Sequence, residues 1–327
     1  MYIHCFLLFS MMFCILLLII LSIWFLKSLT GKRSNSVGCL VGKTAIVTGG
    51  NSGIGYATSC LLASRGCKVI IADVVDTEKS KNAIKLLTGN QNIFTKHLDL
   101  SSLESVRNFA EEINKIEKKI DILINNAGVT TSENLQTSDG LNPIMQINYF
   151  GAFLLTHLLL DSLKTAGSAR VIFLGSALAF FHNLSLNNLN PIGSMNLRKM
   201  MTLYSNSKLC DMLAAQEFGK KLNKCGIVAN SVDPGFIKTN IFRSSHKPWW
   251  YTLTDTVFLM LLSRGPFIGA QTVLELASNE KLTGKTGGHY YQCREWFKPR
   301  ILKNSEFCQE IWKLSEKLVQ LKDDEKI

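Results

Sequence analysis

The chain has 327 residues, a formal net charge of +11 and an apolar fraction of 46%. This length holds one large α/β domain and leaves too little chain for a second enzyme domain. The basic residues form no recognition motif, so nucleic acid is not expected as a partner, and attraction to an anionic membrane surface accounts for the charge. The nine cysteines are scattered and include no CxxC pair, which indicates neither a disulfide framework nor a zinc site.

An apolar segment opens the chain. From Cys5 to Leu26, 22 residues carry no charge, and at about 1.5 Å of rise per residue such a helix crosses the roughly 30 Å hydrocarbon layer of a bilayer. A cleaved signal peptide is the alternative, but it has a basic start, a shorter apolar core and small residues at its cleavage site. Here bulky Trp24 and Phe25 end the run. We therefore expect residues 1–29 to be a retained, single-pass transmembrane anchor.

The charges around this segment predict its direction. Lys27, Lys32 and Arg33 follow it, and no Lys or Arg precedes it. The positive-inside tendency then leaves the rest of the chain in the cytosol. The lack of a disulfide framework agrees with a reducing compartment. One glycosylation sequon begins at Asn183, and chance alone often gives one in a sequence of this length.

The remaining chain reads as a linker over 30–42, one domain over 43–300 and a charged helix or tail over 301–327. Within the domain, short apolar runs alternate with amphipathic stretches, the pattern of βαβ units. The predicted fold is α/β, a doubly wound parallel sheet (a Rossmann fold) of about seven strands with helices on both faces. The strands are expected at Thr44–Thr48, Lys68–Ala72, Asn92–Leu98, Ile120–Asn125, Arg170–Leu174 and Ile227–Val232, and helices at Ile54–Arg65, Leu103–Lys115, Pro143–Leu163 and Tyr204–Leu222.

A glycine-rich run, Thr48–Gly55, joins the first predicted strand to the first predicted helix. Gly49 permits a tight turn, Gly53 lets a pyrophosphate approach the backbone, and Gly55 allows close packing of helix on strand. Free N–H groups at the start of the helix favour phosphate. A plain glycine turn is the alternative, and the βαβ context argues against it. The expected dinucleotide contacts are Gly49, Asn51, Ser52, Gly53, Ile54 and Gly55.

Cofactor choice depends on Asp73, which ends the second strand at nearly the spacing from the glycine loop, about 20 residues, that is expected of an acidic ribose ligand. Its carboxylate can bind both ribose hydroxyls and would repel the 2′-phosphate of NADP. Neither Ser52 nor Val74 supplies a cation for that phosphate. NAD is therefore expected, with NADP as the alternative. Asp99, at the end of the third strand, is a candidate partner for adenine or else the cap of the next helix.

Two further motifs follow. Asn125–Gly128 closes the fourth strand with small residues that leave room for the cofactor, or it is a plain turn; the expected contacts are Asn126, Ala127 and Gly128. In the run Tyr204–Lys208 the first and last residues are four apart, so they share one helix face. A free phenol titrates near 10, and we expect the Lys208 cation and the charge of the nicotinamide together to lower the pKa of Tyr204 so that it can act as a base.

Together these motifs resemble the short-chain dehydrogenase/reductase family, over about Lys43 to Gln292. With the apolar N-terminus, Ala152–Thr156 and Tyr204–Leu209 resemble its microsomal retinol dehydrogenase-like branch. This resemblance implies an oxidoreductase of the endoplasmic reticulum membrane that transfers hydride between a nicotinamide cofactor and an apolar alcohol or carbonyl, such as a retinoid, isoprenoid or steroid. A homo-oligomer is compatible with it.

The resemblance also gives roles to single residues. Ser176 would hydrogen-bond the substrate oxygen and Asn148 would hold a proton-relay water. Tyr204 and Lys208 would be the base and its tuning cation, and both would also contact the cofactor. The remaining cofactor contacts that the family implies are Pro234 and Gly235 beside the nicotinamide and Thr239 near the phosphates.

Three departures from the branch stand out. The branch often has arginine after the second strand and uses NADP, where this chain has Asp73 and Val74. Tyr149 and Phe150 replace a histidine and an aliphatic residue, which is expected to reshape the site near Asn148. In addition, Asp233 stands where histidine is common.

The substrate region is expected in Trp249–Tyr251 and Val257–Leu262, which suit an apolar pocket or membrane contact, or form an ordinary buried helix. Two rival functions stay open. One is an NADP-dependent carbonyl reductase on the same scaffold. The other is a catalytically silent, cofactor-binding membrane scaffold, because a fold does not by itself imply an activity.

Overall fold

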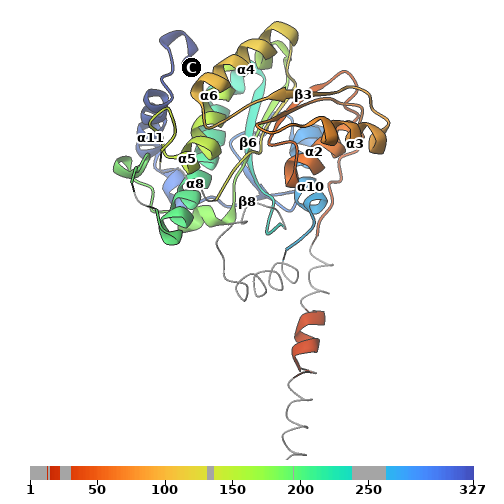
Figure 1. The fold of residues 1–327 in the computed structure, drawn as a ribbon, viewed down its shortest axis with the longest axis horizontal. Coiled ribbons are helices and arrows are strands. Elements are labelled where there is room, and N and C mark those ends of the chain that lie inside the picture. Colours follow the sequence, from red (N-terminus) through yellow and green to blue (C-terminus); the bar gives the residue numbers. More distant parts are fainter. Residues whose placement is uncertain (1–12, 14, 23–30, 131–135, 194, 238–262) are drawn as a thin grey trace, which may run out of the picture.

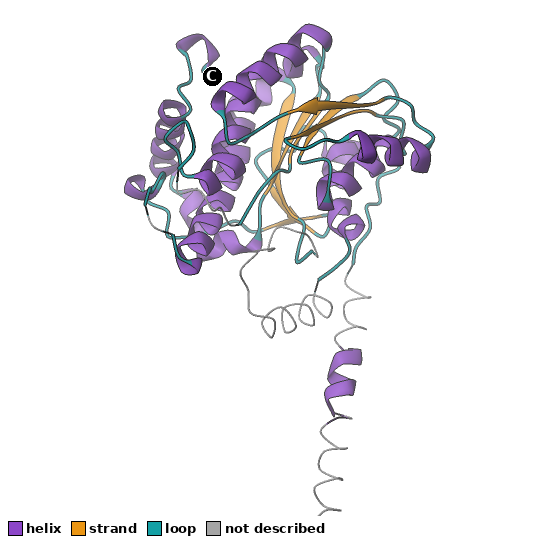
Figure 2. Ribbon diagram, in the orientation of Figure 1, coloured by secondary structure: helices purple, strands orange, loops and turns teal. Residues whose placement is uncertain are grey.

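The computed structural model describes residues 13, 15–22, 31–130, 136–193, 195–237 and 263–327. Its centre is one sheet in the order β3-β2-β1-β4-β5-β6-β7-β8 (Figures 1 and 2). All neighbours run parallel except β7 and β8. The strands are β1 Thr44–Thr48, β2 Lys68–Asp73, β3 Ile93–His97, β4 Ile122–Asn125, β5 Ala169–Leu174, β6 Ile227–Asp233, β7 His289–Tyr291 and β8 Arg294–Trp296.

The predicted doubly wound parallel sheet is confirmed and then extended. The chain winds outward from β1 in one direction to β3 and from β4 in the other direction to β7. The six strand ranges expected from the sequence cover neither β7 nor β8, and β8 is an antiparallel edge strand whose three residues are all exposed. Three residues without alternation between apolar and polar give no periodic signal, which explains the miss.

Helices cover both faces of the sheet. On one face α2, α3 and α10 share a core with the strands. On the other, α4, α6 and α8 pack into a larger core, and α11 lies outside them (Figure 1). The helices are α2 Gly53–Ala63, α3 Glu78–Thr88, α4 Leu103–Ile116, α5 Pro143–Met145, α6 Gly151–Leu158, α7 Leu160–Thr165, α8 Leu197–Leu222, α10 Pro266–Ser278 and α11 Ser305–Leu318.

The helix predicted over Pro143–Leu163 is interrupted. A π-helical turn, Gln146–Phe150, separates α5 from α6, and a further break at Leu159 separates α6 from α7. Close packing accompanies the wide turn, since a Cβ on Gly151 would lie 2.9 Å from the carbonyl oxygen of Leu100. The amphipathic pattern could not indicate this interruption, because π turns arise from local packing inside a helical sequence.

Two other helices differ from expectation. Helix α8 begins seven residues before the predicted start, where the Asn196 side chain accepts a hydrogen bond of 2.9 Å from the amide of Lys199. The C-terminal segment contains helix α11 over Ser305–Leu318. Its Ile311 and Trp312 are buried in the larger core, so α11 is a packed element rather than a charged tail.

The segment preceding β1 is irregular, as expected for the linker, but it does not hang free. Ser34 Oγ donates to Glu275 Oε2 over 2.6 Å, and the Arg65 guanidinium donates to the Ser36 carbonyl oxygen over 2.7 Å. A Cβ on Gly38 would collide with the carbonyl oxygen of Ser278. These contacts hold the segment along α10.

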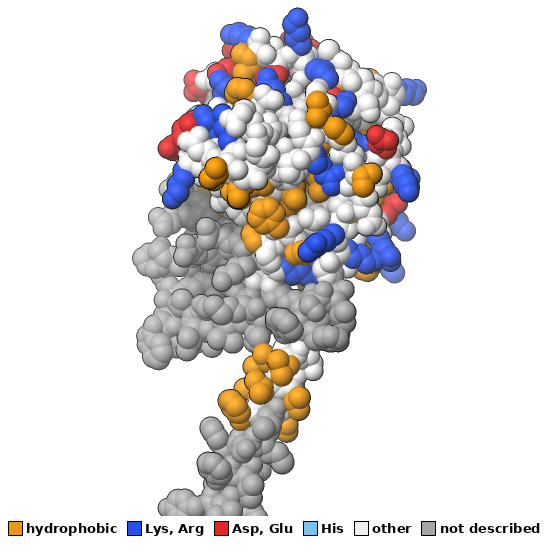
Figure 3. All heavy atoms as spheres, turned by 90° about the vertical axis from the view of Figure 1, so that its right-hand side faces the viewer, with side chains coloured by type: hydrophobic (Ala, Val, Ile, Leu, Met, Phe, Trp, Pro, Cys, Tyr) orange, Lys and Arg blue, Asp and Glu red, His pale blue; other side chains and the backbone are white. Residues whose placement is uncertain are grey.

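Most of the apolar segment Cys5–Leu26 lies outside the described residues. Residues 15–22 are helical, and Figure 3 shows hydrophobic side chains exposed there, Leu18 to 63%. Within the described part of the chain, no helix has both the length and the apolar character needed to cross a bilayer. The substrate segments Trp249–Tyr251 and Val257–Leu262 and the phosphate contact Thr239 also lie outside it.

Candidate active site

A cleft of about 480 Å³ opens at the carboxyl ends of the strands. It lies where the winding reverses between β1 and β4, the position at which open α/β sheets bind ligands. Most of the predicted site residues meet here although they come from five strand ends and two helices. The lining includes Gly49, Ser52, Gly53, Ile54, Asp73, Asp99, Asn126, Ala127, Gly128, Tyr204, Lys208 and Pro234.

The glycine loop between β1 and α2 is shaped by its lack of side chains. Gly49 and Gly53 have φ values of +63° and +54°, which side-chain-bearing residues rarely adopt. A Cβ on Gly55 would collide with the Gly49 carbonyl oxygen and lie 2.5 Å from Asn126 Nδ2. No side chain caps the N-terminus of α2, and its first turn has no acidic residue. The first N–H groups of α2 are therefore available to an anion.

Asn126 ties the loop to the neighbouring strand. Its Nδ2 donates to the carbonyl oxygens of Thr48 and Gly49, over 2.7 and 3.2 Å. The amides of Asn126 and Ala127 donate to Thr48 Oγ1 over 3.0 and 3.1 Å. Asn125–Gly128 is thus more than a plain turn, because it fixes one wall of the cleft relative to the glycine loop.

The two carboxylates at the strand ends have different surroundings. Asp73 Oδ2 accepts from the Asn51 amide over 3.1 Å, so the carboxylate lies beside the glycine loop, and the following Val74 is 52% exposed. Asp99 Oδ1 accepts from the amide and hydroxyl of Ser101, over 2.8 and 2.6 Å. The side chain of Asp99 therefore shapes the turn before α4 while it also lines the cleft. The N-cap of α4 is Ser102 instead.

Tyr204 and Lys208 lie on one face of α8, as the four-residue spacing predicts, and both are buried. Lys208 Nζ lies 5.7 Å from the centre of the Tyr204 ring. It donates to the Leu174 carbonyl oxygen over 2.8 Å and to Asp211 Oδ2 over 2.9 Å. An ammonium has three donors, so one N–H of Lys208 remains for a group in the cleft.

Burial dominates the titration of this pair. It raises the pKa of Tyr204 above its usual value, although the Lys208 cation and a hydrogen bond with Ser176 act in the opposite direction. The Lys208 cation alone therefore does not bring the pKa of Tyr204 below its usual value. Lys208 does act as predicted, but desolvation of the phenolate is the larger effect.

Asp211 was missed by sequence reasoning. Its carboxylate is buried against Lys208, and burial raises its pKa to about 7 despite that cation. Burial lowers the pKa of Lys208, but the charges of Asp211 and Tyr204 together outweigh it, so this pKa lies above its usual value. The signal was available, since Asp211 follows Lys208 by three positions on the same helix. A carboxylate in an amphipathic helix is, however, usually exposed.

Ser176 and Asn148 flank the phenol and the lysine. Ser176 caps a short 3-10 helix, Ala177–Phe181, and its Oγ accepts from the Leu178 amide over 3.2 Å. Asn148 lies in the π-helical turn, where its Nδ2 donates to the Val129 carbonyl oxygen and to Ser207 Oγ, both over 2.9 Å. These bonds fix the orientation of its side chain.

The other two departures can also be placed. Tyr149 and Phe150 are fully buried, and Tyr149 Oη lies 2.8 Å from Ser315 Oγ on α11. Tyr149 therefore joins the π-helical turn to α11, and neither side chain lines the cleft. Asp233 Oδ1 accepts from the Gly235 amide over 2.7 Å. It thereby fixes the turn that carries Pro234 beside the cleft, and Gly235 itself has a φ of +79°.

Comparison with known proteins identifies this arrangement. The short chain dehydrogenase family model matches residues 43–248. Human retinol dehydrogenase 13 is 35% identical over 299 residues, 89% of each chain. Mouse retinol dehydrogenase 11 is 34% identical, over 87% of this chain and 89% of its own.

The chain belongs to the short-chain dehydrogenase family. It resembles the retinol dehydrogenase-like branch, and it is an NAD(P)-dependent dehydrogenase that acts on alcohol or carbonyl groups. Among solved structures, the Pseudomonas aeruginosa RhlG/NADP complex is 25% identical with a TM-score of 0.60, over 77% of this chain and 95% of that one. An uncharacterised Mycobacterium paratuberculosis protein is 27% identical with a TM-score of 0.66, over 88% and 96%.

Proposed function

We propose that this short-chain dehydrogenase oxidises an apolar alcohol of the retinoid, isoprenoid or steroid kind at a membrane, with NAD as its preferred cofactor. When bound, the nicotinamide supplies the hydride acceptor. Tyr204 removes the hydroxyl proton, Ser176 orients the oxygen, and Lys208 stabilises the phenolate. Asn148 is the predicted holder of the relay water. The observation that carries the proposal is the buried contact of Tyr204 with both Ser176 and Lys208.

The burial of Tyr204 is consistent with this role. A phenol that stays protonated in the protein alone needs further positive charge before it can accept a proton near neutral pH. A cationic nicotinamide in the same cleft would supply that charge. Binding of the oxidised cofactor would thus create the base, and the free protein would hold an inert phenol. Fixed donors near the developing oxyanion then lower the barrier.

Asp73 supports NAD. Its carboxylate lies beside the glycine loop, and the next side chain, Val74, is uncharged. A 2′-phosphate at that position would meet repulsion and find no guanidinium. A second candidate is an NADP-dependent carbonyl reductase, which the NADP in the RhlG complex favours.

The substrate class rests on the apolar residues that follow Ser176 and on the names of the relatives. Phe181 and Phe180 follow Ser176 on the short 3-10 helix, 76% and 37% exposed. Apolar side chains beside a few polar anchors suit an apolar alcohol. Several relatives are named retinol dehydrogenases, which makes a retinoid the first substrate to test.

Tyr204→Phe is the direct test of the mechanism. We expect turnover of retinol with NAD to fall by about 10²- to 10⁴-fold, because no proton acceptor remains. The affinity for NAD should change little. Tyr149→Phe is the matched control, since it removes another buried hydroxyl, bonded to Ser315, away from the cleft. The mechanism is wrong if Tyr204→Phe turns over at the wild-type rate with cofactor bound.

We also propose that Cys5–Leu26 anchors the enzyme in the endoplasmic reticulum membrane, with the domain in the cytosol. The apolar length of this segment and the cations that follow it support this. Deleting residues 1–26 should release the protein from membranes while NAD still binds. Asn183 should carry no glycan in cells, and a glycan there would place the domain on the other side of the membrane.

A further inference from the structure

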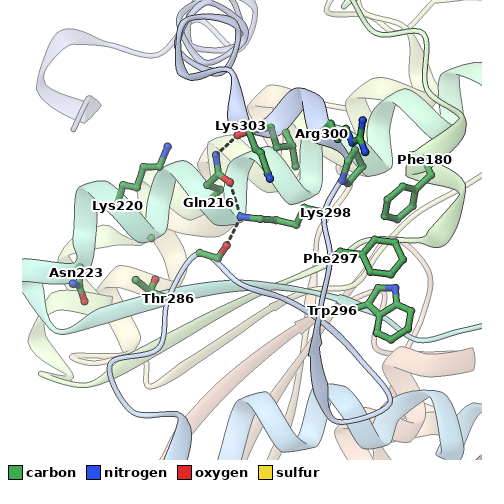
Figure 4. Close-up of a pocket in the computed structure, with 14 residues that line it drawn as sticks. Phe180, Gln216, Lys220, Asn223, Thr286, Trp296, Phe297, Lys298, Arg300 and Lys303 are labelled. Atoms are coloured by element: carbon green, nitrogen blue, oxygen red, sulfur yellow. Dashed lines mark hydrogen bonds between the residues drawn. The ribbon is translucent and has the colours of Figure 1, made fainter.

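A second hollow, larger than the cofactor cleft, lies along the other half of α8. It is a groove of about 1130 Å³ between α8, the loop before β7 and the segment that follows β8 (Figure 4). Phe180 closes it at the end near the active site, and Asn223 lies at the opposite end (Figure 4). None of its lining residues takes part in the chemistry proposed above.

The groove is strongly basic. Four cations line it, Lys220, Lys298, Arg300 and Lys303, and no carboxylate does. Lys220 is paired with Glu217. Across the described ranges, no ion pair or hydrogen bond engages the side chain of Arg300 or Lys303, and both are exposed. Cations without counter-ions attract an anion to this surface.

Lys298 gives the groove a fixed donor at its floor. Its Nζ donates to Gln216 Oε1 over 2.5 Å and to the Gly287 carbonyl oxygen over 2.8 Å (Figure 4). Two neutral acceptors hold the ammonium without cancelling its charge, and the third N–H remains free. Burial, followed by repulsion from Lys220, lowers the pKa of Lys298. An anion in the groove would offset the repulsion between Lys220 and Lys298.

One end of the groove is aromatic. Trp296 and Phe297 lie with their ring centres 4.7 Å apart, and Phe180 meets Phe297 edge-on at 5.4 Å (Figure 4). Trp296 is 46% exposed and Phe297 62% exposed. Exposed aromatic rings beside cations are the composition of a membrane–water interface. In Figure 1, β8 also lies on the side of the body where the N-terminal helix projects.

We propose that this groove binds the anionic headgroup of a membrane phospholipid. The phosphate would lie among Lys298, Arg300 and Lys303, and the acyl chains would leave along Trp296 and Phe297. A soluble phosphate compound would use the cations equally well but would gain nothing from the exposed rings. The combination of both features therefore favours a lipid. This proposal requires the enzyme to meet a membrane, as proposed above, but it does not depend on turnover.

The test uses the full chain in a neutral detergent. It is titrated by calorimetry with dihexanoyl phosphatidylglycerol below its micelle concentration, and with dihexanoyl phosphatidylcholine, glycerol 3-phosphate and inorganic phosphate for comparison. We expect saturable binding of the phosphatidylglycerol and at least tenfold weaker binding of the other three. Tyr204→Phe should bind the phosphatidylglycerol as the wild type does, so failure of the catalytic proposal would be distinguishable.

Three double variants, one of them a control, locate the site. Arg300→Gln/Lys303→Gln should weaken phosphatidylglycerol binding by about tenfold or more, since each cation near an anionic lipid contributes about 1 kcal/mol. Lys79→Gln/Lys118→Gln removes the same charge from exposed positions outside the groove lining and should have no effect. Trp296→Ala/Phe297→Ala should weaken binding of the phosphatidylglycerol and leave the weak binding of glycerol 3-phosphate and inorganic phosphate unchanged. The proposal would be overturned if Lys79→Gln/Lys118→Gln lost as much affinity for the phosphatidylglycerol as Arg300→Gln/Lys303→Gln does. Tight binding of the phosphatidylcholine or of glycerol 3-phosphate would overturn it as well.

Discussion

Helix α8 forms one wall of both the cleft and the groove, and the two sites differ in the charged side chains that line them. In the cleft, the one buried cation, Lys208, is paired with Asp211, and the other charged side chains are the carboxylates Asp73 and Asp99. In the groove, cations stand without a lining carboxylate. A ligand phosphate in the cleft must therefore be held by backbone N–H groups, whereas side chains would hold it in the groove. Phosphate binding in the cleft would therefore depend on the shape of the backbone, and phosphate binding in the groove would depend on side-chain charge.

Gly55→Ala is the strongest test of the dependence on shape. The added Cβ would collide with the Gly49 carbonyl oxygen and with the side-chain nitrogen Asn126 Nδ2, and the Gly49 backbone cannot give way easily. We expect the dissociation constant for NAD to rise by about a hundredfold, equal to about 2.7 kcal/mol. Overpacking should also lower the free energy of unfolding by about 1–3 kcal/mol.

A fluorescence titration with NADH and a thermal melt measure these two effects of Gly55→Ala. Gly265→Ala is the control, because a Cβ there meets no atom within 4 Å. If Gly55→Ala binds NADH normally, the glycine loop does not position the cofactor as proposed.

The next prediction concerns charge inside the cleft. The double variant Asp73→Ser/Val74→Arg removes the carboxylate that repels the 2′-phosphate of NADP and adds a guanidinium that can bind it. The cofactor preference should therefore move toward NADP. The wild type should favour NAD by about tenfold in kcat/KM, which one unfavourable charge contact of about 1.4 kcal/mol provides. Steady-state kinetics with both cofactors measure the preference. A wild type that prefers NADP would mean that Asp73 does not bind the ribose, and reduction would become the favoured direction.

The contrast also explains what sequence reasoning could reach. Strand β1 was predicted with its observed ends because Thr44–Thr48 is a buried apolar run bounded by turn residues. The glycine loop and the Tyr204–Lys208 pair were found because they are local motifs whose spacing follows from helix and turn geometry. Their proximity in one cleft is now a structural fact, while their catalytic and binding roles stay predictions.

The features that were missed arise from packing between distant segments. The π-helical turn coincides with the approach of Gly151 to Leu100, which no periodicity encodes. The groove gathers residues from α8, the loop before β7 and the segment after β8, none of which forms a motif. The burial of Asp211 depends on the layers that enclose α8 and not on its neighbours in sequence.

The smallest expected effect tests whether Asp211 acts through its charge. Because its pKa is about 7, Asp211 is mainly neutral below pH 6 and mainly ionised above pH 8. When ionised it raises the pKa of Tyr204, which is already raised by burial. Asp211→Asn keeps an acceptor for Lys208 and removes only the charge. The two enzymes should therefore have the same rate of alcohol oxidation at low pH and should diverge above pH 7.

The direction of the divergence follows from the role of the base. Tyr204 must lose its proton to act, so a lower pKa for Tyr204 makes Asp211→Asn the faster enzyme above pH 7, by about threefold. The two rates should converge again at high pH, once Tyr204 is ionised in both enzymes. A pH series of kcat with saturating NAD measures this. If Asp211→Asn loses turnover equally at every pH, the carboxylate instead fixes the position of Lys208, and its charge does not tune Tyr204.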